Sequence, residues 1–138
     1  MTCPFCEIAE GRVPAEIVWR SESALAFLDH RPLFPGHVLL IPLEHYTTLA
    51  DLPRPLVGPL FQAAQDVQGA VETAMEAEGS FIAVNNRVSQ SVPHLHIHIV
   101  PRRKGDGLKG FFWPRRPYES DEHLRETGEK IRRALKGQ

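Results

Sequence analysis

Apolar positions in the first third of the chain come in short runs separated by turn-forming residues. These runs predict strands at residues 16–20, 24–28 and 38–43. Ser21-Glu22-Ser23 and Pro35-Gly36 supply turn signals between them. Three consecutive short strands joined in this way indicate a meander.

A helical repeat follows the third strand. Pro55 and Pro59 fit only in or before the first turn of a helix, so the helix is predicted to begin near one of them and to end by Gly79. Its apolar residues recur at spacings of three and four and so share one face; they are Leu56, Leu60, Ala64, Val67, Val71 and Met75.

Two more strands are predicted at residues 81–84 and 94–100, and Ser120 is a candidate N-cap for a terminal helix. Strands, helix, strands and helix follow one another without regular strand–helix alternation. This order predicts an α+β fold, an antiparallel sheet of about five strands with helices on one face. The apolar positions of the terminal helix are Leu124, Gly128, Ile131 and Leu135.

Composition narrows the class of protein. A chain of 138 residues with 42% hydrophobic and 24% charged residues suits one soluble domain spanning residues 1–138, and this composition argues against disorder and membrane insertion. The formal net charge of -1 argues against a nucleic-acid or membrane partner. The first ten residues lack a secretory signal pattern, which leads us to expect a cytoplasmic protein.

Positive charge is nevertheless concentrated in one stretch near the C-terminus. Such a stretch can bind phosphates locally even when the whole molecule is close to neutral. Its residues are Arg102, Arg103, Lys104, Lys109, Arg115 and Arg116.

Histidine alternates with apolar residues in the fifth predicted strand. Because successive side chains of a strand point to opposite faces, His94, His96 and His98 should share one face. The alternating apolar residues Leu95, Ile97 and Ile99 should point into the core. A row of imidazoles offers a nucleophile or proton carrier near neutral pH, and protonated neighbours stabilise phosphate charge.

Metal binding is a competing interpretation of these histidines. A His-x-His pair on a strand can bind zinc, and the chain offers Cys3, Cys6 and His45 as further ligands. The Cys-x-x-Cys spacing favours zinc over a pair of free thiols or a redox pair, although the gaps to the histidines leave the ligand set open. Four protein ligands would make the zinc structural.

The segment from His94 to Val100 resembles the histidine-φ-histidine-φ-histidine-φ-φ motif of the histidine triad superfamily of nucleotide hydrolases and transferases. The likeness extends to Phe27-Leu28-Asp29, to residues 35–42, and to Asn85-Asn86 and Gln90-Ser91-Val92-Pro93. It implies a dimer in which two copies of the chain pair through the long helix and an adjacent strand, so that their sheets form one continuous ten-stranded sheet.

The resemblance also implies residue roles. His96 would be the nucleophile that forms a nucleotidyl-histidine intermediate, His98 would contact the α-phosphate, and His37 would complete the phosphate site. Asp29 would bind the ribose hydroxyls. The implied ligands of the phosphate oxygens or leaving group are Gln90, Ser91 and either Asn85 or Asn86. The choice between the two asparagines stays open, because the 86–90 loop is shorter than is common in the family.

The same resemblance implies a structural zinc site. Family members with an N-terminal Cys-x-x-Cys bind zinc through two cysteines and two histidines, and the corresponding residues are Cys3, Cys6, His45 and His94. His96 and His98 would then remain for phosphate chemistry. His30 and His123 have no motif support and are expected to be structural or exposed.

The resemblance therefore implies a purine nucleotide hydrolase or transferase that acts on the α-phosphate. Dinucleoside polyphosphates such as diadenosine tetraphosphate are slightly favoured, since the basic stretch suits a long polyphosphate. Alternatives are nucleoside phosphoramidates, a nucleotide-binding signalling protein with vestigial catalysis, and a zinc-stabilised nucleic-acid-binding module, which the charge balance disfavours. An apolar base pocket is expected from Phe5, Ile8, Phe27, Leu28 and Leu39.

Overall fold

The computed structural model describes residues 3–108 and 114–137, in two compact units divided after Asp106. The expectation of one domain over the whole chain stays a prediction. The first unit contains, in order, α1 (Pro4–Ala9), β1 (Ile17–Arg20), β2 (Ala24–Leu28), β3 (Val38–Pro42), the 3-10 turn η1 (Leu49–Asp51), α2 (Arg54–Ala74), β4 (Gly79–Val84) and β5 (Ile97–Arg102).

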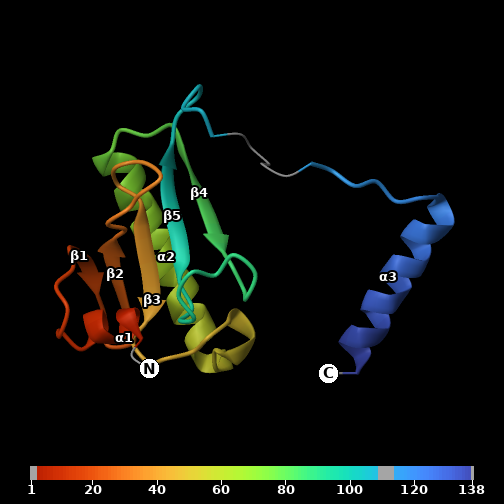
Figure 1. Ribbon diagram of the computed structural model, residues 1–138, viewed down its shortest axis with the longest axis horizontal. Coiled ribbons are helices and arrows are strands. Elements are labelled where there is room, and N and C mark those ends of the chain that lie inside the picture. The colour runs from red at the N-terminus through yellow and green to blue at the C-terminus, as the bar shows by residue number, and fades with distance from the viewer. Residues whose placement is uncertain (1–2, 109–113, 138) are drawn as a thin grey trace. The chain divides into compact units, whose positions relative to one another are not determined.

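The five strands form one antiparallel sheet in the order β1-β2-β3-β5-β4 (Figure 1). Strand β2 pairs with β3, where Leu25 lies opposite Ile41, and β3 pairs with β5, where Leu39 lies opposite His98. The predicted α+β fold with five antiparallel strands is confirmed.

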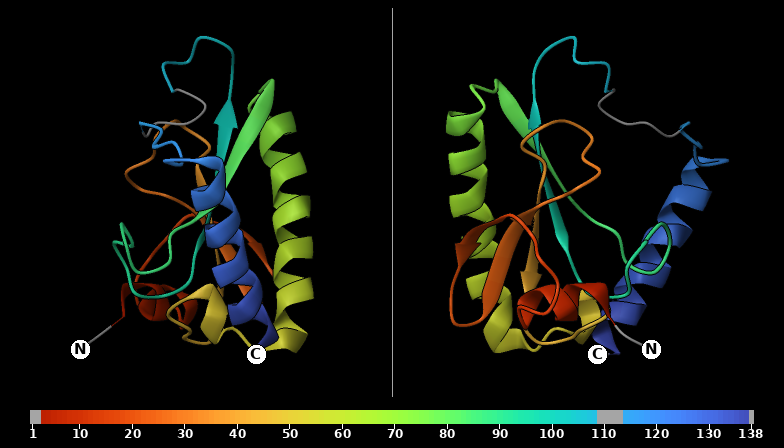
Figure 2. Two further views of the ribbon diagram at one scale, coloured as in Figure 1. Left: turned by 90° about the vertical axis from the view of Figure 1, so that its right-hand side faces the viewer. Right: turned by 60° about the vertical axis from the view of Figure 1, so that its left-hand side comes forward.

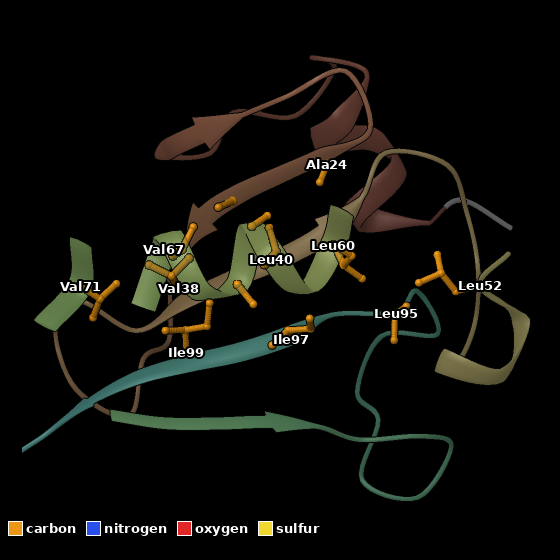
Figure 3. Close-up of a cluster of buried hydrophobic side chains, with 13 residues drawn as sticks. Ala24, Val38, Leu40, Leu52, Leu60, Val67, Val71, Leu95, Ile97 and Ile99 are labelled. Carbon is orange, nitrogen blue, oxygen red and sulfur yellow. The ribbon is translucent and has the colours of Figure 1, made fainter. Parts of the chain in front are cut away.

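The long helix α2 covers one face of this sheet, while α1 lies against the other (Figure 2). The expectation that the helices lie on one face is therefore wrong for α1. Val67 and Val71 of α2 pack over Leu40, Ile97 and Ile99 (Figure 3). Burying such side chains stabilises the fold by roughly 1.5–3 kcal/mol each. The core under α2 therefore fixes β3 and β5, the two strands on which the histidines depend.

The start of α2 beside Pro55 agrees with the prediction, but the position of Pro59 does not. The helix begins at Arg54, so Pro59 lies in its second turn and not in or before the first. Proline at this position costs one helical hydrogen bond, but Leu60, Ala63 and Ala64 follow at once and are each only 3% exposed. Their packing against the sheet outweighs the lost bond and keeps the segment helical.

The start of β5 also differs from the prediction, because the regular strand begins at Ile97 and leaves His94 and His96 ahead of it. The amide of Leu95 donates a hydrogen bond to Tyr46 O at 2.7 Å, outside the sheet ladder. Leu95, Ile97 and Ile99 are nevertheless all fully buried on the α2 side, so the predicted alternation holds through the irregular segment.

The second unit contains α3 (Asp121–Lys136). The side chain of Ser120 accepts a hydrogen bond from the amide of His123 at 3.0 Å, which confirms Ser120 as the N-cap. The ring nitrogen Nδ1 of His123 accepts a further bond from the amide of Glu119, so this histidine is structural, as expected.

Candidate functional site

His94, His96 and His98 lie on the sheet face that α1 covers. The first two are buried, at 0% and 3% exposure, and His98 is half-buried. The ring centroids of His96 and His98 are 4.9 Å apart. His37, which ends the loop after β2, is also buried and brings a fourth imidazole to the cluster.

One backbone contact fixes the chemical form of His96. Its Nδ1 lies 2.7 Å from the carbonyl oxygen of His94, and a carbonyl only accepts, so Nδ1 carries the proton. In the neutral ring, Nε2 then has the free lone pair. The Phe5 and His96 rings pack in a T-shaped arrangement, at 89° with centroids 5.1 Å apart, which limits how the imidazole can turn.

His37 and His98 form a directed pair. The amide of Leu33 donates to Nδ1 of His37 at 3.1 Å, so Nε2 of His37 carries the proton and donates it to Nδ1 of His98 at 3.0 Å. His98 must therefore carry its own proton on Nε2. No hydrogen bond within the described residues engages that Nε2–H, which leaves it available to a ligand.

Burial keeps this pair neutral. It lowers the pKa of His98 to about 4, with the nearby His96 and His37 adding to the effect, and it lowers the pKa of His37 as well. At neutral pH the pair therefore offers a phosphate a hydrogen-bond donor without a full positive charge.

Asp29 lies directly after β2 and next to this pair. Its Oδ1 accepts a hydrogen bond from the Arg31 amide at 3.0 Å, and its own amide donates to His37 O at 2.9 Å. Its Oδ2 lies 3.8 Å from Nδ1 of His37, and that nitrogen already accepts from Leu33. Oδ2 therefore keeps acceptor capacity for a ligand.

The predicted metal ligands converge at the N-terminal end of α1. Nδ1 of His94 lies 3.3 Å from Cys3 Sγ and 3.5 Å from Cys6 Sγ, while Nδ1 of His45 lies 3.4 Å from Cys6 Sγ. The ligand atoms of Cys3, Cys6, His45 and His94 all lie within 4.8 Å of one another.

This donor set fits zinc. Tetrahedral zinc with Zn–S of about 2.3 Å and Zn–N of about 2.0–2.1 Å places its sulfur and nitrogen ligands about 3.5 Å apart, as they are here. The Nε2–H of His94 donates to Pro42 O at 2.9 Å, so Nδ1 is the nitrogen left free for metal. Burial, and then the adjacent Cys3 thiol, raise the pKa of Cys6, which a bound cation would offset.

The loop between β4 and β5 uses several of its polar side chains to hold itself together. Asn86 Oδ1 accepts from the Leu49 amide at 2.9 Å. Gln90 accepts from the Arg87 amide at 2.8 Å and donates to Thr47 O at 2.6 Å. The half-buried Asn85 directly follows β4, two residues after Ala83, which lies opposite His98, and Ser91 is exposed.

Sequence comparison now decides the family. The profile of the HIT domain matches residues 10–105, which is most of the chain. The chain belongs to the HIT domain family.

Relatives of this HIT protein include proteins with and without a known activity. It is 38% identical over 128 residues to an uncharacterised HIT-like protein of Methanocaldococcus jannaschii, covering 90% of this chain and 97% of that protein. It is 31% identical to an adenosine 5′-monophosphoramidase of Schizosaccharomyces pombe, covering 99% and 100%. Its 36% identity to the asymmetrical bis(5′-nucleosyl)-tetraphosphatase of the same yeast covers 68% of this chain and 53% of that enzyme.

Solved structures carry the same fold. A HIT family protein from Bacillus subtilis superposes with a TM-score of 0.86 at 32% identity, covering 96% of both chains. A zinc-bound histidine triad family protein from Mycobacterium smegmatis superposes with a TM-score of 0.74 at 33% identity, covering 100% of this chain and 99% of that one. The HIT fold is therefore shown for this chain.

The basic stretch of this HIT protein is less available than its sequence indicates. Arg102 makes a two-point ion pair with Asp106, at 2.6 and 3.0 Å, and Arg103 donates to the carbonyls of Met75 and Glu76 at the end of α2. Both side chains thus stabilise the turn after β5. Lys109 lies outside the described residues.

The base pocket expected for the HIT domain needs one correction. Leu28 faces α2 and not the histidines, because β2 alternates and only Leu25 and Phe27 point to the α1 side. Phe5, Ile8, Phe27 and Leu39 do gather on that side, with the Phe5 and Phe27 rings 5.3 Å apart. His30 is exposed, as expected.

The partners that fix the imidazoles are the part of the site that the sequence does not reveal. They are the amide of Leu33 and the carbonyls of Pro42 and His94. Every residue carries such groups, so no residue type marks them. Leu33 and His94 lie only four and two residues from the histidines that they contact, which is a weak signal, whereas Pro42 lies 52 residues from His94.

Proposed function

We propose that this protein hydrolyses nucleoside 5′-phosphate derivatives through a covalent nucleotidyl-histidine intermediate on His96. The observation that carries the proposal is the His96 Nδ1–H bond to His94 O, which leaves Nε2 as a fixed nucleophile. Membership of the HIT family, with relatives named for nucleotide hydrolysis, supports the same reaction class.

The reaction has two displacements. Nε2 of His96 attacks the α-phosphorus and forms a P–N bond, while the bond to the leaving group breaks and its electron pair departs with that group. Water then attacks the same phosphorus and displaces His96, giving a nucleoside monophosphate. The Nε2–H of His98 donates to a non-bridging oxygen in both transition states, a contact worth roughly 3–4 kcal/mol when preorganised.

Ground-state binding rests on other groups. The free Oδ2 of Asp29 accepts hydrogen bonds from ribose hydroxyls, and the Phe5–Phe27 side of the sheet takes the base. Of the two asparagines, Asn85 is the better candidate for substrate, since Asn86 already binds the Leu49 amide. Ser91 is more available than Gln90, whose amide oxygen and nitrogen are both engaged.

The leaving group we favour is a small amine, as in a nucleoside phosphoramidate. The case for a long polyphosphate rested on the basic stretch, and Arg102 and Arg103 of that stretch are engaged within the turn after β5. The similarity to the yeast phosphoramidase also spans both whole chains. Dinucleoside polyphosphates are the second candidate, supported by the similarity to the tetraphosphatase.

Zinc is proposed as a structural ion held by Cys3, Cys6, His45 and His94. When bound, it is enclosed by four protein ligands, so it contributes to folding and does not activate water. The zinc-bound neighbour from Mycobacterium smegmatis is consistent with this assignment.

We also propose that two copies pair through α2 and the edge strand β4. Phe61 of α2 and Ile82 of β4 line one surface depression and are each 40% exposed. Of the small residues along α2, Ala63 and Ala64 face the core at 3% exposure, whereas Ala70 and Ala74 are exposed. No helix in the described part of the chain is long and apolar enough to cross a membrane.

The test measures turnover and the intermediate together. Adenosine 5′-phosphoramidate and diadenosine tetraphosphate are mixed separately with the protein, quenched at high pH where histidine–phosphorus bonds survive, and analysed by intact and peptide mass. We expect an AMP adduct on the His96 peptide and faster turnover of the phosphoramidate. His96→Ala should abolish turnover with nucleotide affinity within about tenfold, and His98→Ala should slow it less.

His123→Ala is the matched control, since His123 lies in α3 and takes no part in the proposed site. It should turn over like the wild type. Near-normal turnover by His96→Ala, or an adduct on another residue, would refute the nucleophile assignment. Nucleotide binding with no turnover of either substrate would instead favour the signalling protein with vestigial catalysis.

A further inference from the structure

A cavity of about 220 Å³ lies between α2 and β1, on the sheet face away from the histidines. The helix packs over β3 and β5, whereas β1 is the edge strand beyond β2, so a space remains between the helix and this edge. All of the lining residues lie between Val18 and Met75, within the first unit. The dimer surface proposed at Phe61 and Ile82 lies beside β4, at the opposite edge of the sheet, and leaves the cavity open.

Small residues keep this cavity open. Asp66, Ala70 and Ala74 follow one another at spacings of four along α2, so they share the side of the helix that lines the cavity. At the end of the helix, Gly36 adopts a φ of +98°, and a Cβ at this position would lie 2.6 Å from Cγ of Met75. The loop before β3 can therefore approach Met75 only because Gly36 has no side chain, and the two alanines leave the space beside β1 unfilled.

The cavity is apolar except for one carboxylate. Its walls include Trp19, Leu28 and Val71, and Asp66 is its only charged residue. Asp66 is exposed, and no hydrogen bond or ion pair within residues 3–108 and 114–137 engages its carboxylate. Apolar cavities of about 150 Å³ stay dry and bind benzene, so this one has room for a ring with a short arm. The unpaired carboxylate favours an arm that ends in a positive charge.

We propose that this cavity is a second ligand site, for a small molecule with an apolar ring and one protonated amine. The ring lies between Trp19 and the alanines of α2, and the amine pairs with Asp66. The cavity is smaller than the roughly 300–1,000 Å³ of sites for drug-sized ligands, which limits the ligand to one ring and a short arm. Because the site lies on the other sheet face from the histidines, it does not depend on the proposed function.

The cavity lies directly behind two residues of the candidate functional site. Leu28 and Val38 both line it and lie opposite each other in the pairing of β2 with β3. Asp29 follows Leu28 and His37 precedes Val38, and the Asp29 amide donates to His37 O at 2.9 Å. A ligand packed against Leu28 and Val38 therefore contacts the back of this turn, and its binding should shift the amide resonances of Asp29 and His37.

The test titrates 2-phenylethylamine into the full 15N-labelled chain at neutral pH and follows the resonances of Trp19, Ala70 and Ala74. These should shift and saturate, with a dissociation constant of about 1 mM, as expected for so small a ligand. The neutral analogue 2-phenylethanol should bind about three- to fivefold more weakly, because it lacks the ion pair with an exposed carboxylate. The anion phenylacetate should bind more weakly still.

Two variants separate the ring from the amine. Ala70→Leu fills the cavity and should weaken binding of 2-phenylethylamine at least about tenfold. Asp66→Asn should keep binding of the ring and remove the preference for the amine over the alcohol. Both replacements are at exposed positions of α2, so the fold is kept. Thr73→Leu is the matched control, since it adds the same side chain at an exposed position that does not line the cavity, and it should bind like the wild type.

The proposal is overturned if the resonances do not saturate at concentrations about tenfold above the expected dissociation constant. Equal affinity for the amine, the alcohol and the anion would contradict the amine class, and unchanged binding by Ala70→Leu would place the ligand elsewhere. Nuclear Overhauser contacts in the free protein between the methyl groups of Ala70 or Val71 and a second copy, or another segment of the chain, would show that protein fills the cavity and would also refute it. Loss of the proposed turnover on His96 would leave the site unaffected.

Discussion

Acidification should destabilise this protein through His98 in a defined pH window. Burial lowers the pKa of His98 from its ordinary 6.5 to about 4 in the folded chain. As the pH falls below 6.5, the unfolded chain binds a proton at this residue while the folded chain does not. Stability is therefore lost between pH 6.5 and about 4, and it is fully present above 6.5.

The size of the effect follows from the two pKa values. Linkage gives a loss of about 2 kcal/mol in the free energy of unfolding between pH 7.5 and 5, rising to about 3 kcal/mol below pH 4. A domain whose total stability is about 5–15 kcal/mol would lose a substantial part of it. The lowered pKa of His37 acts in the same direction.

The assay compares the wild type with His98→Asn by urea unfolding at several pH values, followed by the fluorescence of the half-buried Trp19. Both proteins keep the same metal ligands, so proton competition at that site cancels in the difference. The wild-type advantage in unfolding free energy should shrink by about 2 kcal/mol from pH 7.5 to 5. A difference that stays flat, or that grows on acidification, would refute the neutral form of His98.

Three further predictions concern metal, assembly and the substrate loop. Protein purified without added metal should contain about one zinc per chain by elemental analysis, and chelation should lower its melting temperature; no zinc and two titratable thiols would contradict this. Light scattering should give a dimer mass, and Ile82→Glu should give a folded monomer; a monomeric wild type at micromolar concentration would rule out the pairing. Asn85→Ala should slow turnover about tenfold or more, whereas Asn86→Ala should cost about 1 kcal/mol of stability by leaving the Leu49 amide without its acceptor. Kinetics and urea unfolding measure the two effects, and the reverse pattern would exchange the roles of the two asparagines.

The sheet and α2 could be predicted because their apolar spacing repeats over many residues. Leu60, Val67 and Val71 lie on the buried side of α2, and Leu95, Ile97 and Ile99 alternate as a strand should. The helix α1 escaped prediction, because its six residues are too few to show a helical period.

Other features depend on tertiary contacts that no local pattern records. The start of β5 moves to Ile97 because the Leu95 amide binds Tyr46 O, a residue far away in the sequence. Likewise, the sequence indicates a basic patch at Arg102 and Arg103, but in the structure their side chains donate hydrogen bonds to Asp106 and to the end of α2. The site side chains could be named from a family motif, but their tautomers depend on backbone groups.

The distance along the chain between Cys3 and His94 has a consequence for folding. The two residues are 91 positions apart, so a metal ion bound to both would close a loop of that length. Chain-entropy reasoning gives a cross-link of this span a stabilisation of about 4–5 kcal/mol. Unlike a disulfide, this cross-link is reversible by chelation. During synthesis the set of four metal ligands is complete only once His94 has left the ribosome, after β1 to β4 and just before β5, so complete metal capture would come late.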